Sequence, residues 1–159
     1  MEVNVGVIEA AIGHMGGEAE YGLEKLRRLD SEGRGTEFFA EARTALDGFR
    51  TTVIFDVKNE YHTLLGKLEL APLYDPDAQG PPSVNVRLIL SWLRDDLVLL
   101  DQLIRKVRES CTAGSTLRPD ADRGLLVLLL ETVGTEMLKS YSSLREALEL
   151  LLQSRGEVS

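Results

Sequence analysis

The fold is decided by residues 67–83, which read KLELAPLYDPDAQGPPS. This stretch holds four of the five prolines in the chain. Proline lacks a backbone N–H and clashes with the preceding helical turn, so a helix cannot run through these residues. Long helical patterns lie on both sides of the stretch, and the length of this connection limits how those helices can be arranged.

Four segments repeat apolar residues every three or four positions, which is the spacing of an amphipathic helix. They cover about residues 5–29, 36–66, 83–111 and 120–153. Sustained period-two alternation and Asn-Gly turns are both missing from the sequence, so strands are not indicated. Residues 1–159 are therefore predicted to form a single all-α domain.

Glycines are the weak point of the first segment, which contains Gly13, Gly16, Gly17 and Gly22. Each glycine costs a helix about 1 kcal/mol relative to alanine. We expect this helix to survive because tertiary packing supports it, or because the small residues let a neighbouring helix approach closely.

The connections between the helices predict the topology. The first and third are short, which favours antiparallel neighbours. The middle connection, about 17 residues, could extend about 55 Å, more than the length of a 30-residue helix at about 45 Å. We therefore predict a ferritin-like four-helix bundle with one long crossover between helices two and three. The alternative is an ordinary antiparallel bundle with a long loop at one end.

Composition excludes several classes of protein. The net charge of −8 argues against a nucleic-acid partner held through phosphate contacts. The longest apolar run, Leu125 to Leu130, is too short to span a membrane. The first residues lack the basic region of a signal peptide, and the single Cys111 excludes an internal disulfide. These features predict a cytoplasmic protein.

Carboxylates occupy positions where apolar residues are expected. At 100° per residue, Glu60 lies about 20° from Val53 on the apolar stripe, and Asp56 lies at the edge of the same face. Asp96 lies about 40° from Leu100 in the third helix. A buried carboxylate needs a partner, a raised pKa, a metal ion or a subunit interface. The alternative is that these groups reach solvent or pair with arginine.

Motifs for catalysis are absent from the sequence. It contains no Gly-x-Ser-x-Gly elbow, no phosphate-binding loop and no strand-borne Gly-x-Gly-x-x-Gly, so nucleotide cofactors and nucleophilic catalysis are not indicated. The Glu-x-x-His motif of di-iron bundles is also missing. The only histidines, His14 and His62, are predicted to be surface or interface groups.

The second helical segment and its approach resemble the mini-ferritins of the Dps type, the DNA-binding proteins from starved cells. The residues that carry the resemblance are Arg34-Gly35, Phe38, Leu46-Asp47-Gly48-Phe49-Arg50-Thr51, Asp56-x-x-x-Glu60 and Leu65-Gly66. In motif the resemblance covers about residues 34–66, and in helix lengths it covers the whole chain.

The resemblance implies a homo-oligomeric, dodecameric shell that stores iron and protects against oxidative stress. In this family iron is oxidised between two subunits, and Asp56 and Glu60 would supply one half of that site. The family histidine that precedes the Arg-Gly pair is replaced by Asp30, which could complete an all-carboxylate site for a hard cation. The basic N-terminal tail of the family is missing, which argues against condensation of DNA.

Two functions are therefore compatible with the sequence. The first is a Dps-like subunit that binds iron, with a reduced or altered ferroxidase site that would oxidise Fe(II) with peroxide or oxygen. The second is a ferritin-like bundle without redox chemistry that acts as a structural or protein-interaction module. The missing histidines favour the second, as does the apolar surplus around the last helix at Leu125, Val127, Leu128 and Leu129.

Overall fold

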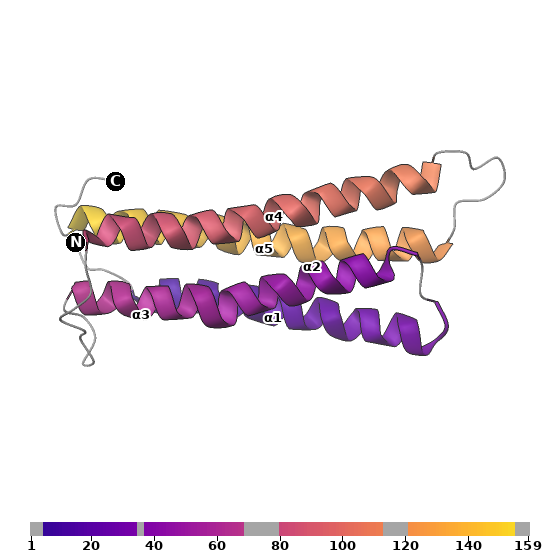
Figure 1. Cartoon of the computed structure of the whole chain (residues 1–159), viewed down its shortest axis with the longest axis horizontal. Helices are drawn as coiled ribbons and strands as arrows, with labels where there is room; N and C mark the ends of the chain where they lie inside the picture. The colour runs from indigo at the N-terminus through magenta and orange to yellow at the C-terminus, as the bar shows by residue number, and fades with distance from the viewer. Residues whose placement is uncertain (1–4, 35–36, 69–79, 113–120, 155–159) are drawn as a thin grey trace.

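The computed structural model describes residues 5–34, 37–68, 80–112 and 121–154, and all its regular structure in these ranges is helical (Figure 1). The elements are α1 (Val5–Ser31), α2 (Phe39–Thr51), η1 (Thr52–Val57), α3 (Lys58–Lys67), α4 (Pro82–Thr112) and α5 (Ala121–Ser154). Because α2, η1 and α3 continue one another without a break, they form one long helix. The all-α prediction is confirmed, and the four predicted segments agree with the observed helices to within three residues.

The four long helices run in alternating directions along the bundle (Figure 1). At the end of α3, Lys67 Nζ donates a hydrogen bond of 2.7 Å to Asn85 Oδ1, close to the start of α4. The chain therefore enters α4 at the same end of the bundle where it leaves α3. The predicted crossover along the length of the bundle is wrong, and the ordinary antiparallel arrangement is found. A long connection can join neighbouring ends because the entropy cost of closing a loop rises only slowly with its length.

The core lies along the axis of the bundle, where α1 packs against α2 and α5 while α4 packs against α2, α3 and α5. Each helix directs one apolar stripe inward, as an amphipathic helix must in order to remove that face from water. The largest fully buried side chains come from all the long helices: Tyr61, Phe49, Ile8, Met15, Leu26, Leu46, Leu64, Ile89, Leu93, Leu130, Met137 and Leu144.

The glycines of α1 have two different environments. A Cβ atom at Gly22 would lie 2.7 Å from Leu46 Cδ1 and 3.3 Å from Val133 Cγ2, so α1 approaches α2 and α5 closely at this point. A Cβ atom at Gly13 or Gly17 would meet nothing within 4 Å. The expected close packing of helices is therefore present at Gly22, whereas Gly13 and Gly17 leave open space.

A π-helical turn, η1, interrupts the α-helical phase of the long second helix. An i→i+5 turn holds about one residue more than an α turn, so every later side chain is rotated back by about one position. As a result Tyr61, which is 2% exposed, points into the core at the angle that the helical wheel assigned to Glu60. The prediction that Glu60 lies in the middle of the apolar stripe is therefore wrong, and Glu60 is half-buried at its edge.

Candidate functional site

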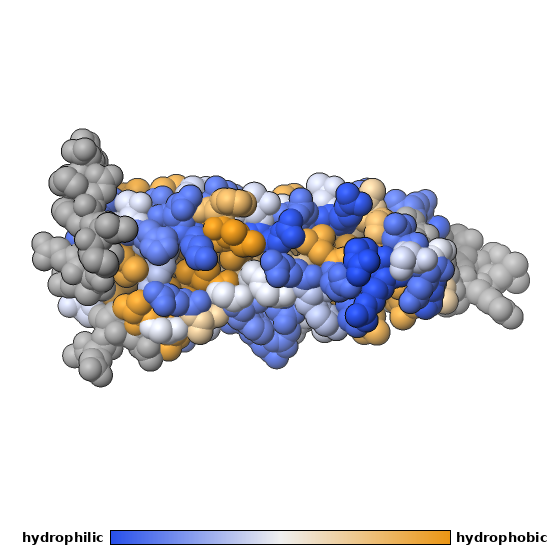
Figure 2. Space-filling view, turned by 90° about the horizontal axis from the view of Figure 1, so that it is seen from below, coloured by the Kyte–Doolittle hydropathy of each residue, from blue (hydrophilic) through white to orange (hydrophobic). Residues whose placement is uncertain are grey.

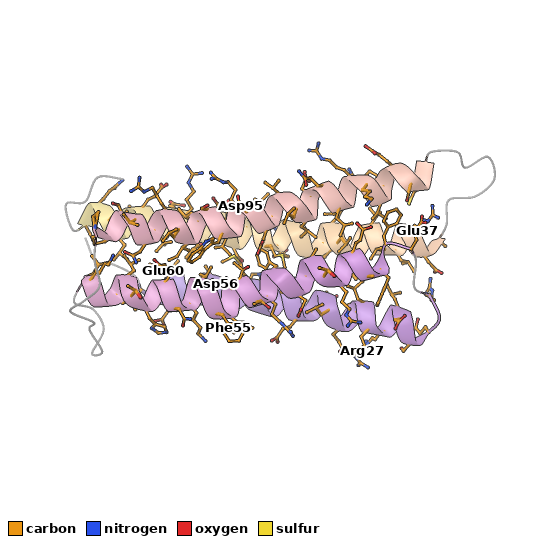
Figure 3. All side chains as sticks on the ribbon, viewed as in Figure 1. Arg27, Glu37, Phe55, Asp56, Glu60 and Asp95 are labelled. Atoms are coloured by element: carbon orange, nitrogen blue, oxygen red, sulfur yellow. The ribbon has the colours of Figure 1, made fainter. Side chains whose placement is uncertain are left out.

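The three predicted metal ligands lie in different parts of the chain. Asp56 is an exposed residue of η1, and the half-buried Glu60 follows one turn later in α3 (Figure 3). Asp30 is exposed near the end of α1, at the opposite end of the bundle from Glu60 (Figure 1). Within residues 5–34, 37–68, 80–112 and 121–154, no three His, Cys, Asp or Glu side chains are grouped so that they could hold a metal ion. One copy of the chain thus brings Asp56 and Glu60 near one another but leaves Asp30 apart.

Glu60 has a hydrogen-bond partner that the sequence analysis did not identify. Asn85 Nδ2 donates to Glu60 Oε1 at 2.9 Å, while Asn85 Oδ1 accepts the bond from Lys67 Nζ. Asn85 is 2% exposed and lies four residues before Ile89, on the buried stripe of α4. The sequence could have indicated this bond, because Asn85 lies on the apolar stripe and a buried amide must find hydrogen-bond partners. The three side chains join α3 to α4, and this role for Glu60 is structural.

Asp96 lies where α4 faces η1, and it is half-buried. Its Oδ2 atom is enclosed and has no hydrogen-bond partner among the described residues. Burial raises the pKa of the Asp96 carboxyl, a hydrogen bond from Thr52 lowers it, and the negative charges of Asp95 and Asp56 raise it again. Figure 3 shows Asp95 and Asp56 in the same part of the bundle. Three carboxylates therefore repel one another at the η1–α4 contact.

Replacement of Asp96 by asparagine should stabilise the protein by about 1 kcal/mol at neutral pH. The pKa of Asp96 is raised in the folded state, so this group destabilises the fold as the pH rises above its ordinary pKa of 3.8. Asparagine keeps a polar group next to Thr52 without the charge. Urea unfolding of both proteins as a function of pH would measure the difference, which should grow from acid to neutral pH. The exposed Asp101→Asn serves as a control, and an equal gain in that variant would contradict the interpretation.

A groove of about 560 Å³ runs between α1 on one side and η1 with α3 on the other. Its α1 side contains Gly13, Gly16 and Gly17, and its opposite side contains Ile54 and Tyr61. Volumes of this size are typical of sites that bind a ligand or part of a partner protein. The open space at Gly13 and Gly17 gives the groove its depth.

The Tyr61 hydroxyl in this groove is enclosed and has no hydrogen-bond partner among the described residues. Burial, together with the negative charge of Glu9 on α1, raises the pKa of Tyr61 to about 12. A buried hydroxyl without a partner costs about 1–3 kcal/mol. A molecule in the groove would recover this cost only if the side chains that enclose the hydroxyl moved aside.

Large apolar side chains are exposed on all four long helices. Among the described residues, those with exposed fractions of 37% or more are Val7, Tyr21, Ile54, Phe55, Leu88, Val98, Leu99, Leu128, Leu138 and Leu150. Leu128 reaches 62%, which confirms the apolar surplus around the last helix. Figure 2 shows apolar residues gathered in the half of one face towards which α3 extends. In the described ranges, no helix has a stretch that is both long and apolar enough to cross a membrane.

Three features thus distinguish this bundle: the hydrogen-bonded Glu60, the carboxylates around Asp96, and the groove beside Tyr61. The predicted surface position of both histidines is confirmed, since His14 and His62 are exposed. Similarity to other proteins does not explain these features, because no family model, no curated protein and no solved structure matches the chain.

Proposed function

We propose that the chain is a protein-interaction module, a four-helix bundle that works by binding another protein surface. The observation that supports this proposal is the exposed apolar surface, above all Phe55 at 59%, Leu99 at 58% and Leu128 at 62%. Burial of one such side chain against a partner gains about 1.5–3 kcal/mol. A few contacts of this size are enough to hold a complex together.

The polar contacts of the bundle fit the same role. The carboxylate of Glu60 accepts a hydrogen bond from Asn85, and this bond joins α3 to α4. The exposed His14 lies near two carboxylates, 3.8 Å from Glu18 and 3.6 Å from Glu136. Such contacts position helices and surface charges, which is what a binding scaffold requires.

Site-specific photocrosslinking in the cells that produce the protein tests this proposal. A benzophenone amino acid is placed at Phe55, Leu99 or Leu128, and at the exposed polar positions Arg105 and Lys139 as controls. Their side chains are 71% and 70% exposed, so they are equally accessible. We expect a discrete protein adduct from at least one apolar position and none from the controls. The absence of an adduct at all three apolar positions, or equal labelling at every position, would overturn the proposal.

A second candidate is the iron-binding shell of a cytoplasmic, Dps-like protein, which the resemblance of residues 34–66 implies. Asp56 and Glu60, which lie one turn apart on the long second helix, favour it, because oxygen ligands suit hard cations. The antiparallel arrangement of α3 and α4 makes it the weaker candidate, since the crossover of ferritin-like bundles is missing.

Light scattering and iron-oxidation kinetics separate the two candidates. A shell of twelve subunits, together with loss of Fe(II) oxidation in the Asp56→Ala, Glu60→Ala double variant, would favour the iron function. A monomer or dimer whose oxidation rate is unchanged by these substitutions would eliminate it.

A further inference from the structure

The groove between α1 and η1 has a cavity and a projecting side chain next to one another. Gly13 and Gly17 leave open space on its α1 side. Phe55, which is 59% exposed, follows directly after Ile54 of the groove wall and points to the outside of the bundle (Figure 3). A surface that has both a cavity and a projecting side chain can complement a copy of itself.

The charges along the groove are also self-complementary. The side formed by α1 carries Glu9 and Glu20, whereas the side formed by η1 and α3 carries Lys58 and His62. All four are exposed. In the part of the chain that the structure describes, neither Glu20 nor Lys58 forms an ion pair. Both charges therefore remain available to a partner.

Building on the interaction role proposed above, we propose that the partner in this groove is a second copy of the chain. The two copies pair about a two-fold axis, and Phe55 of each enters the groove between α1 and η1 of the other. A two-fold contact places the same patch on both copies and exchanges its two sides. With the axis placed between the two sides of the groove, it sets the acidic α1 side of one copy against the basic α3 side of the other.

The enclosed Tyr61 hydroxyl gives a second reason for an occupant that carries polar groups. It lies in the wall of the groove without a hydrogen-bond partner among the described residues. Asp56 and Asn59 are exposed within one turn of Phe55. When Phe55 enters the groove, the side chains that enclose the Tyr61 hydroxyl must shift before either acceptor can reach it. With that shift, the dimer satisfies a group that has no partner among the described residues of the isolated chain.

Sedimentation velocity across a concentration series tests the interface on the full chain. We expect wild type to dimerise reversibly. Phe55→Ser should weaken dimerisation by at least about a hundred-fold, because each dimer loses two buried phenyl groups. Gly17→Leu should abolish it by filling the groove, while the fold persists because Leu extends into open space. Gly48→Leu is the matched control, since Gly48 has equally open surroundings in the groove between α2 and α4.

Charge reversal tests the orientation of the two copies. Glu20→Lys and Lys58→Glu should each weaken the homodimer, because like charges then face one another at both ends of the contact. An equimolar mixture of the two variants should form a mixed dimer, in which both ends are again complementary. Failure of the mixture to associate better than either variant alone would overturn the proposed arrangement.

Tyr61→Phe separates a role in the interface from a role in folding. Loss of the unpaired hydroxyl should raise the unfolding temperature of the monomer and weaken the dimer about ten-fold. A wild-type chain that stays monomeric overturns the dimer, as does a dimer that is sensitive to Gly48→Leu but not to Gly17→Leu. The broader interaction role is decided separately, by the crosslinks from Leu99 and Leu128, which lie outside this groove.

Discussion

Replacement of Phe49 by alanine is expected to lower the free energy of unfolding by about 3–5 kcal/mol. Phe49 is 1% exposed and belongs to the core that α2 shares with the other helices. Its removal leaves a cavity that the surrounding helices can close only in part, so dispersion contacts and apolar burial are both lost. Urea unfolding at a protein concentration low enough to prevent association would measure the loss.

Phe55 provides the matched control for this experiment. It lies on the same continuous helix but is 59% exposed. Phe55→Ala should therefore change the free energy of unfolding of the monomer by no more than about 0.5 kcal/mol. Similar losses for the two variants would contradict the different positions that the structure assigns to these phenylalanines.

Replacement of Gly22 by leucine is the second substitution with a large expected effect, a loss of about 3 kcal/mol. The new side chain would begin 2.7 Å from Leu46 Cδ1 and 3.3 Å from Val133 Cγ2. Leu46 and Val133 are fully buried, so they cannot move aside without disturbing the core. Overpacking of this kind costs about 1–3 kcal/mol, and leucine adds a whole branched side chain.

Gly13→Leu is the control on the same helix, because a Cβ atom at Gly13 meets nothing within 4 Å. It should stabilise the monomer by about 0.5–1 kcal/mol, since leucine favours the helix over glycine. Thermal and urea unfolding of both variants would show opposite changes in stability. A gain in stability from Gly22→Leu would mean that α1 does not approach α2 and α5 as closely as described.

The helices could be predicted from the sequence because their apolar spacing is a local property of the chain. Proline and glycine placed the connections, and the observed bounds differ from the predicted ones by three residues at most. The topology could not be predicted in the same way. The length of residues 67–83 sets only the greatest distance that they can span, and it says nothing about the end of the bundle to which they return.

The candidate site was predicted in part. Asp96 is half-buried next to Thr52, as its place on the apolar stripe indicated. Glu60 was assigned to the core because the helical wheel assumes a constant angle per residue, which the π turn does not keep. The hydrogen bond between Glu60 and Asn85 joins two helices. Spacing within one helix carries no information about such a pair.

The π turn at Thr52–Val57 also makes the long second helix tolerant of the loss of one residue. A π turn is the form that a helix takes when it accommodates one inserted residue while the segments on both sides keep their packing. Deletion of the exposed Ile54 would let the helix continue in α geometry with Tyr61 still directed into the core. A sequence that lacks one residue at this place would therefore align with this chain through a single gap inside a helix.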